Sequence, residues 1–276
     1  GDAGGSLGAA LGAYHIMLNQ PRHVSTTLDG MKGSYLGPQF TQQEITDSLN
    51  RCHAIFKTLT DVDVVEQTAQ ALASGKAIGW MNGRMEFGPR ALGGRSIIAD
   101  PRSPTMQKLL NLKVKYRESF RPFAPSVLRE DVSDWFEIED DSPYMLLVAD
   151  VVKGKRRGMT AEELTLFGID KLNIPRSEIP AVTHVDYSSR IQTVHQETNP
   201  RYYAIIKRFK ELTGCPVIVN TSFNVRGEPI VCTPEDAFRC FMGTELDMLV
   251  VGNAVLTKTE QSPSLFANYK SAYELD

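Results

Sequence analysis

The chain has 276 residues, a length that fits one large domain or two small ones. Hydrophobic residues make up 42% and charged residues 23%, as in globular proteins, and no apolar run reaches the roughly 18–20 residues of a membrane span. The net charge of −3 argues against electrostatically driven nucleic-acid binding and favours a small-molecule partner. The four cysteines are far apart, with no CxxC pair, which argues against a zinc site or disulfide framework and predicts a cytoplasmic protein.

The first segment, residues 1–13, is a glycine-rich turn that leads into a short amphipathic helix. Free amides at a helix N-terminus suit an anion, although the same residues could form an ordinary Ala/Gly-rich helix. Because no strand precedes the turn, we interpret residues 1–22 as the last helix of a domain whose body is missing here. We expect this helix to lie against the body or a neighbouring molecule, with its apolar face (Leu7, Leu11 and Leu18) only partly covered.

Periodicity and capping signals predict alternating helices and strands along the rest of the chain. Helical spacing predicts helices over 41–59, with a capping box at Thr41 and Glu44, and over 63–74, 104–112, 200–213 and 234–242. Apolar runs predict strands over 77–81, 97–99, 144–152, 189–194, 216–219 and 248–251. The alternation indicates an α/β or α+β domain. We therefore expect a linker with a helix at 23–62, a body at 63–261 and a surface tail at 262–276.

Three polar segments are candidates for binding. The first is the loop 82–96, in which four glycines separate Arg84, Glu86, Arg90 and Arg95. Guanidinium groups bind phosphate or carboxylate oxygens two at a time, and glycine lets the backbone close on a ligand. The loop therefore predicts an anion site, although Arg84 and Glu86 could equally form a structural ion pair.

The second candidate is the basic segment 113–125. On an extended segment, Lys115 and Arg117 would point to one side, together with Lys113. The alternative is a solvated basic strand. We favour a ligand site because two prolines in 121–125 fix the backbone and place Arg121 between aromatic residues.

The third candidate is the polar segment 220–224, which follows a strand that we expect to be buried. Ligands of open α/β sheets bind just beyond strand ends. Ser222 and Asn224 alternate with Phe223, which gives one polar and one packing face, and Asn220 and Thr221 come directly before them. The alternative is a plain polar turn.

Together these motifs resemble the carboxy-terminal half of the O-carbamoyltransferases, a family that includes the nodulation-factor, cephamycin and tobramycin enzymes. The resemblance covers about residues 64–256 and rests on the segments 83–96, 115–125, 190–194, 220–224 and 227–230. It implies a YrdC-like mixed, twisted sheet flanked by helices. It also implies a preceding Kae1-like domain of the actin-like ATPase superfold, of which residues 1–22 would be the last helix.

The resemblance also implies roles for particular residues. Lys115 and Arg117 fit the Lys-x-Arg pattern, and Ser222 and Asn224 the Ser-x-Asn pattern, that YrdC-like domains place around a nucleotide and a carbamoylated substrate; these four are the expected catalytic residues. The expected substrate- and nucleotide-binding residues are Arg84, Glu86, Arg90, Arg95, Arg121, Asn220 and Thr221. Asp2 fits the late metal-binding aspartate of the Kae1-like half.

The metal, iron or magnesium, would be bound only with that missing half, because His15, His23 and His53 lack suitable spacing to complete the site. The implied function is ATP-dependent O-carbamoyl transfer, in which ATP and carbamoyl phosphate form carbamoyl adenylate for an acceptor hydroxyl. The expected partners are these small molecules, the missing half and a possible second copy in a homodimer, but no nucleic acid or membrane. The alternative is a non-catalytic nucleotide-binding module that regulates or scaffolds a partner. We also expect this chain alone to be incomplete for acceptor transfer.

Overall fold

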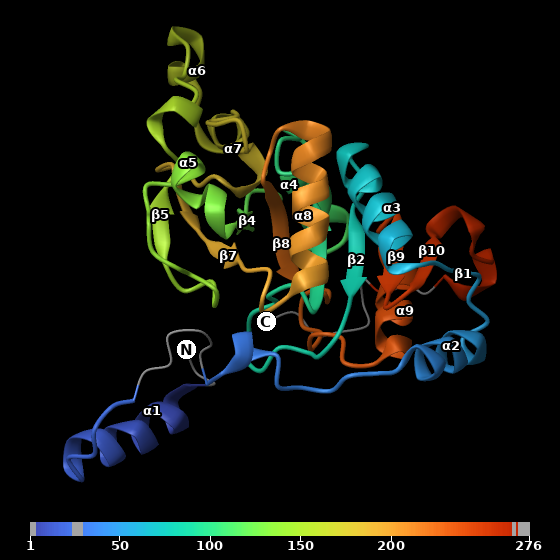
Figure 1. Ribbon diagram of the computed structural model, residues 1–276. Helices are drawn as coiled ribbons and strands as arrows, with labels where there is room; N and C mark the ends of the chain where they lie inside the picture. The colour runs from blue at the N-terminus through green and yellow to red at the C-terminus, as the bar shows by residue number, and fades with distance from the viewer. Residues whose placement is uncertain (1–3, 24–29, 267–268, 270–276) are drawn as a thin grey trace.

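The computed structural model describes residues 4–23, 30–266 and 269, and its centre is an eight-stranded mixed sheet (Figure 1). The strand order is β1-β10-β9-β2-β3-β8-β4-β7, and a separate two-stranded sheet pairs β5 with β6. Neighbouring strands are antiparallel except for β2 with β9 and β4 with β7. The strands are β1 Lys57–Thr58, β2 Ile78–Met81, β3 Arg95–Ala99, β4 Ala124–Leu128, β5 Val148–Asp150, β6 Ser188–Arg190, β7 Gln192–Val194, β8 Val217–Ser222, β9 Met248–Val251 and β10 Ala254–Thr257.

Helices flank this sheet, so the predicted mixed sheet with flanking helices is confirmed. The helices are α1 Gly5–Gly12, α2 Gln42–Arg51, α3 Asp61–Ala73, α4 Met106–Lys113, α5 Val132–Trp135, α6 Ala161–Thr165, α7 Gly168–Leu172, α8 Pro200–Thr213 and α9 Pro234–Gly243. Short 3₁₀ or π segments lie at Ala13–Met17, Lys32–Ser34, Arg129–Asp131, Lys153–Lys155, Pro180–Val182, Lys258–Glu260 and Pro263–Leu265. The helices α3 and α8 lie side by side on one face of the sheet (Figure 1).

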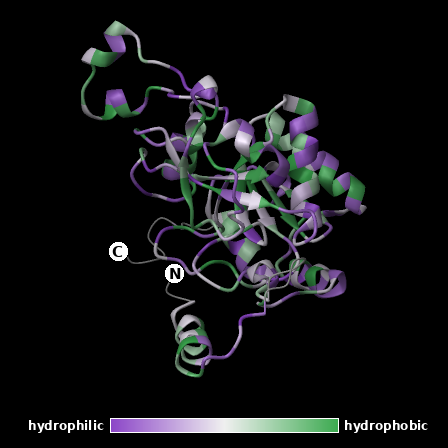
Figure 2. Ribbon diagram, turned by 60° about the vertical axis from the view of Figure 1, so that its left-hand side comes forward, coloured by the Kyte–Doolittle hydropathy of each residue, from purple (hydrophilic) through white to green (hydrophobic). Residues whose placement is uncertain are grey.

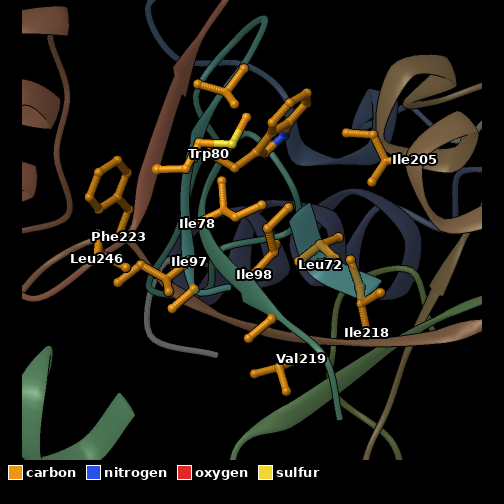
Figure 3. Packing of buried hydrophobic residues seen from close by; sticks show 14 of the residues in the cluster. Leu72, Ile78, Trp80, Ile97, Ile98, Ile205, Ile218, Val219, Phe223 and Leu246 are labelled. Carbon is orange, nitrogen blue, oxygen red and sulfur yellow. The ribbon is translucent and has the colours of Figure 1, made fainter. Parts of the chain in front are cut away.

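The central strands β2, β3, β4 and β9 are buried because the sheet is covered there, and Figure 2 shows the hydrophobic residues gathered on the central strands. Trp80, Ile97 and Phe223 are fully buried and lie in one cluster (Figure 3). Gly79 of β2 is required by this packing, since a Cβ there would lie 2.6 Å from Cζ of Phe223. The packed core therefore fixes the C-terminal end of β8, whose last three residues, 220–222, belong to the third polar segment.

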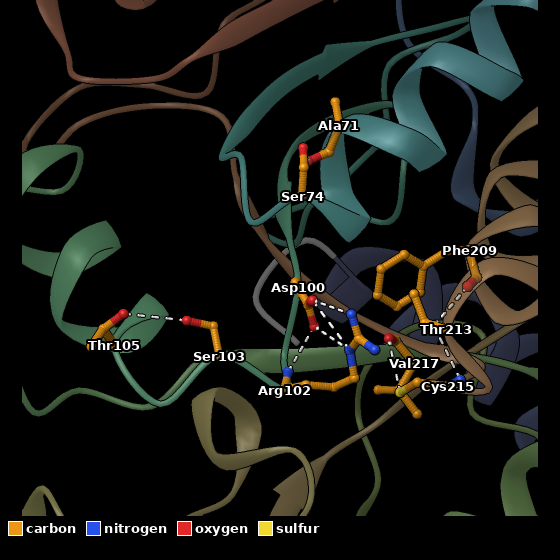
Figure 4. Close-up of polar contacts among 10 residues, drawn as sticks. All are labelled: Ala71, Ser74, Asp100, Arg102, Ser103, Thr105, Phe209, Thr213, Cys215 and Val217. Atoms are coloured by element: carbon orange, nitrogen blue, oxygen red, sulfur yellow. Dashed lines mark hydrogen bonds and ion pairs between the residues drawn. The ribbon is translucent and has the colours of Figure 1, made fainter.

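The opposite end of the sheet is held by an ion pair. Directly after β3, the Asp100 carboxylate accepts hydrogen bonds from Nε and Nη2 of Arg102, the latter at 2.6 Å (Figure 4). The Arg102 guanidinium also lies over the ring of Phe209 of α8, 5.2 Å from its centroid. This pair ties β3 to α8 and leaves the other end of β8 for the polar segments.

The helix α1 and the π segment that follows it contain no buried residue. Leu7, Leu11 and Leu18 are 45%, 48% and 63% exposed, so the predicted partial covering of this apolar face is confirmed. Within the described part of the chain, no helix has both the length and the apolar character needed to cross a bilayer.

The structure corrects several predicted elements. The helix predicted over 41–59 ends at Arg51, because His53 takes a left-handed φ of 55° and the chain turns back toward β1. The strand predicted over 144–152 shortens to β5, and the strands β4 and β10 were not predicted. Tyr269 lies within the predicted surface tail, 262–276, but its side chain is buried, at 5% exposure.

Candidate functional site

A cavity of about 430 Å³ opens at the C-terminal end of β8. Its walls are mostly polar and carry four basic side chains and one carboxylate. The lining residues are Lys115, Arg117, Arg121, Ser222, Asn224, Val225, Arg226, Gly227, Glu228 and Pro229. The structure therefore brings the Lys-x-Arg and Ser-x-Asn segments, more than 100 residues apart in sequence, into one site.

Lys115 is the most buried basic residue of the cavity, at 3% exposure. Its Nζ donates to the Ser222 carbonyl oxygen at 2.5 Å, and to the carbonyl oxygen and Oδ1 of Asn224 at 2.9 and 2.7 Å. Burial, reinforced by the positive charge of Arg117, lowers the pKa of Lys115 to about 7. The ammonium group of the Lys-x-Arg segment is therefore bound by the Ser-x-Asn segment, and it titrates near neutral pH.

Arg117 is held by a buried asparagine. Its Nε donates to Oδ1 of Asn111 at 2.7 Å, and its guanidinium lies 5.2 Å from the ring centroid of Phe123. Burial and the neighbouring Arg121 lower the pKa of Arg117 to about 10. Asn111 also donates to the carbonyl oxygens of Ser119 and Arg121, at 3.1 and 2.8 Å. This single side chain of α4 thus shapes the whole basic loop.

The predicted extended arrangement of Lys113, Lys115 and Arg117 is wrong. Lys113 ends α4, is exposed and pairs with Glu245 at 2.6 Å, outside the cavity. Tyr116 then takes a left-handed φ of 49°, so the chain turns between Lys115 and Arg117. A turn, rather than the period of a strand, brings these two side chains into the cavity.

Ser222 and Asn224 form the other wall. The Ser222 hydroxyl donates to Oδ1 of Asn224 at 2.7 Å, and Nδ2 of Asn224 donates to the Glu228 carbonyl oxygen at 2.6 Å. Arg226 follows directly and lines the cavity, with its amide donating to the Lys115 carbonyl oxygen at 3.3 Å. Sequence reasoning did not select Arg226, although an arginine two residues after a Ser-x-Asn motif was available as a signal.

The remaining candidates of the loop 82–96 lie outside the cavity lining. The buried Glu86 carboxylate accepts from the amides of Leu92, Gly94 and Arg95, so it folds the loop onto itself. Arg95 is fully buried and donates to the carbonyl oxygens of Gly83, Gly94 and Pro38. Arg84 donates to the carbonyl oxygen of Gly37 and is exposed. No ion pair links Arg84 with Glu86 in the described chain.

Asn220 and Thr221 also lie outside the lining. Asn220 is 1% exposed and donates to the carbonyl oxygen of Ala91 and to Oε1 of Gln192, at 3.0 and 2.8 Å. Its Oδ1 is buried and has no partner among the described residues. Thr221 is half-buried and pairs with Ile97 of β3.

A second basic pair lies near these residues. Arg90 is exposed, and its positive charge adds to burial in lowering the pKa of Arg190, whose buried Nε has no partner in the described part of the chain. Arg190 belongs to the segment 190–194 that carries part of the resemblance, but the sequence analysis assigned it no binding role.

The metal prediction at Asp2 lies outside the described residues. Within residues 4–23, 30–266 and 269, no group of three or more His, Cys, Asp or Glu side chains is placed to hold a metal ion. The cavity carboxylate, Glu228, has both oxygens engaged: Oε1 accepts from the Tyr269 hydroxyl and Oε2 from the Val225 amide, at 2.6 and 2.9 Å.

The structure thus places a Lys-x-Arg and a Ser-x-Asn segment around one basic cavity at one end of a mixed sheet. The chain belongs to the family described as carbamoyltransferase C-terminus, whose model matches residues 69–258.

The chain is also similar to several longer proteins. An uncharacterized protein of Synechocystis sp. is 61% identical over 95% of this chain and 43% of its own length. Nodulation protein NolO of Bradyrhizobium diazoefficiens is 38% identical over 95% of the chain and 44% of its own length. The 3'-hydroxymethylcephem-O-carbamoyltransferase of Amycolatopsis lactamdurans is 29% identical over 94% of the chain and 43% of its own length. The chain thus spans less than half the length of these relatives.

Among solved structures, full-length HypF in its phosphate- and nucleotide-bound form is similar at 17% identity and a TM-score of 0.42. The match covers 73% of this chain and 22% of HypF.

Proposed function

We propose that the cavity binds ATP and carbamoyl phosphate and joins them into carbamoyl adenylate. One observation carries the proposal: Lys115, Arg117, Arg121 and Arg226 converge on one cavity with the Ser-x-Asn segment. Both substrates are anions, and bringing them together requires fixed positive charge to offset their repulsion. A cavity lined by four basic side chains, with its one carboxylate already engaged, fits that requirement.

The proposed reaction breaks two bonds to phosphorus. Water cleaves carbamoyl phosphate into carbamate and inorganic phosphate. A carbamate oxygen then attacks the α-phosphorus of ATP, and pyrophosphate leaves with the electron pair of the broken P–O bond. Negative charge grows on the α-phosphate oxygens during this attack, so Lys115 and Arg117 act as fixed cations beside them. Ser222 and Asn224 hold the Lys115 ammonium in place through their oxygen atoms.

The final acceptor in this proposal is a hydroxyl group. The name of the Amycolatopsis relative states O-carbamoyl transfer to a hydroxymethyl group. That relative aligns with 94% of this chain. Because the chain spans less than half of that relative, we propose that a further domain similar to the rest of the relative holds the acceptor and the metal. Transfer requires the acceptor to lie against the activated carbonyl carbon.

Isothermal titration with ATP and with carbamoyl phosphate tests the binding step. The chain offers a matched pair of lysines: Lys115 in the cavity and Lys113, two residues away, paired with Glu245 outside it. Lys115→Ala should weaken binding about ten- to a hundredfold, as expected for one lost charge-assisted contact. Lys113→Ala should leave the affinity unchanged. Equal affinities in both variants and the parent chain would contradict the proposal.

A further inference from the structure

Tyr269 contacts Glu228, one of the residues that line the cavity, although it lies far from the motifs in sequence. Its side chain is 5% exposed and packs against Gly243, the last residue of α9. A Cβ at Gly243 would lie 2.4 Å from Cγ of Tyr269, so the absence of a side chain there makes room for the ring. The ring therefore occupies a close-fitting position rather than lying on the surface.

The Tyr269 hydroxyl reaches the cavity wall through Glu228. It donates to Oε1 of Glu228 at 2.6 Å and accepts from Nε of Arg239 at 3.2 Å. The second Glu228 oxygen accepts the Val225 amide at 2.9 Å, and the Glu228 carbonyl oxygen accepts Nδ2 of Asn224 at 2.6 Å. A continuous series of hydrogen bonds thus runs from Tyr269 to Asn224.

The same series reaches Lys115. Asn224 accepts from the Lys115 ammonium through Oδ1 and through its carbonyl oxygen. The negative charge of Glu228 is also one of the influences that favour the protonated form of Lys115. Loss of the Tyr269 hydroxyl would remove a hydrogen-bond donor from the buried Glu228 carboxylate, and the Glu228 side chain is then expected to shift toward water or another partner. The segment 224–229, which carries Asn224 and Arg226, would shift with it.

We propose that Tyr269 is a positioning residue for the cavity: it holds Glu228 and thereby sets the position of Asn224 and Arg226. Its importance for ligand binding rests on the function proposed above. Its effect on the segment 224–229 does not, so the two proposals are tested separately.

The test compares Tyr269→Phe with Tyr203→Phe. Both variants keep the ring and remove a tyrosine hydroxyl that donates to a glutamate, but the partner of Tyr203 is Glu130, away from the cavity. Two properties are measured in each variant: hydrogen–deuterium exchange of the amides in 224–229, and ATP affinity by titration. Tyr269→Phe should speed exchange in this segment and weaken ATP binding, each by about three- to tenfold. Tyr203→Phe should change neither.

A third variant tests whether the effect passes through Glu228. In a Glu228→Ala background, Tyr269→Phe should cause no further loss of ATP affinity, because its acceptor is already gone. Unchanged exchange in Tyr269→Phe would overturn the proposal, and so would faster exchange with unchanged ATP affinity. If the parent chain itself fails to bind ATP, the proposed function fails, whereas the exchange data still decide whether Tyr269 orders the segment.

Discussion

Lys115 is a buried lysine whose acceptors are the carbonyl and side-chain oxygens of Ser222 and Asn224. These oxygens stabilise the ammonium form, while removal from water and the nearby Arg117 favour the neutral form. The balance places the pKa at about 7, well below the usual value for lysine. An anionic ligand would add negative charge beside Nζ and raise this pKa again.

Anion binding should therefore depend on pH. Lys115 is protonated below about pH 7 and neutral above it, so ATP affinity should be highest below pH 7 and fall as pH rises toward 8.5. Binding at pH 8 should also take up a proton, which titration in buffers of different ionisation enthalpy measures. Lys115→Met should abolish both effects, apart from the titration of ATP itself. A parent chain with a flat pH profile would contradict the assignment.

The linked effect on folding has the opposite sign. Between about pH 7 and the usual lysine pKa, the unfolded chain binds more protons at this residue than the folded chain does. The contribution of Lys115 to the free energy of unfolding should therefore rise with pH across that window.

Asn224 and Ser222 are expected to differ in their effect on stability. Asn224 contacts Lys115, Ser222 and Glu228, so Asn224→Ala should lower the free energy of unfolding by about 1–3 kcal/mol. Ser222→Ala removes only a hydroxyl and should lower it by about 1 kcal/mol or less. Both variants should slow pyrophosphate release more than they weaken ATP binding. Urea unfolding and steady-state kinetics measure these quantities, and lost ATP affinity with intact turnover would reassign both residues to nucleotide binding alone.

At the scale of elements, the glycine-rich loop 82–96 is folded by its own carboxylate. Three amides donate to Oε1 of Glu86, and the buried Arg95 guanidinium binds the carbonyl oxygens of Gly83 and Pro38. Sequence reasoning assigned these side chains to an external anion. The structure shows that the loop's own backbone amides and carbonyl groups are their partners.

Glu86→Ala should therefore destabilise the fold by about 3 kcal/mol or more, because three buried amides lose their acceptor. Arg84 is exposed, and Arg84→Ala should stay within about 0.5 kcal/mol of the parent chain. Urea unfolding measures both. Equal stability of the two variants would show that Glu86 does not hold the loop.

Sequence patterns predicted the elements with strong local signals. The capping box at Thr41 and the bounds of α8, Pro200–Thr213, lie where the sequence placed them. The strand β4 was missed because Pro125 is disfavoured within a sheet interior, yet it pairs with Val219 between β8 and β7. The β9–β10 hairpin was missed although Gly252 and Asn253 between two β-branched runs are a hairpin signal.

The residues of the candidate site were predictable from the sequence only where they belong to short motifs. Lys115, Arg117, Ser222 and Asn224 were selected, whereas Asn111, Arg226 and Tyr269 contribute through tertiary contacts. Asn111 looks like an ordinary polar residue of a helix, and Tyr269 like part of a polar tail. Their roles depend on the left-handed turn at Tyr116 and on the space that Gly243 leaves for the Tyr269 ring. Neither feature is marked by a pattern in the neighbouring sequence.

At the scale of the whole molecule, the two ends of the sheet differ: an ion pair lies at one end and the basic cavity at the other. The Asp100–Arg102 pair lies directly after β3, where Arg102 also contacts Phe209 of α8 (Figure 4), and the basic cavity lies at the other end of the sheet. The helix α1 takes no part in this core, since none of its residues is buried. The body therefore carries both the hydrophobic core and the cavity.

Because α1 contributes nothing to the core, polar substitutions on it should leave the body unaffected. Leu7→Glu and Leu11→Glu should each change the free energy of unfolding by less than about 0.5 kcal/mol, as expected for exposed positions. Leu72→Ala in α3, which is fully buried, serves as the contrast and should cost about 2–5 kcal/mol. Destabilisation by the α1 variants as large as that of Leu72→Ala would show that α1 belongs to the folded core.

The most direct test of the proposed function is pyrophosphate release from ATP by the purified chain, with and without carbamoyl phosphate. We predict that release requires carbamoyl phosphate and is lost in Lys115→Ala and Arg117→Ala but kept in Lys113→Ala. ATP binding with no pyrophosphate release would instead favour a non-catalytic nucleotide-binding module. Release at equal rates without carbamoyl phosphate, or in the two cavity variants, would contradict the assignment of this cavity to carbamoyl adenylate formation.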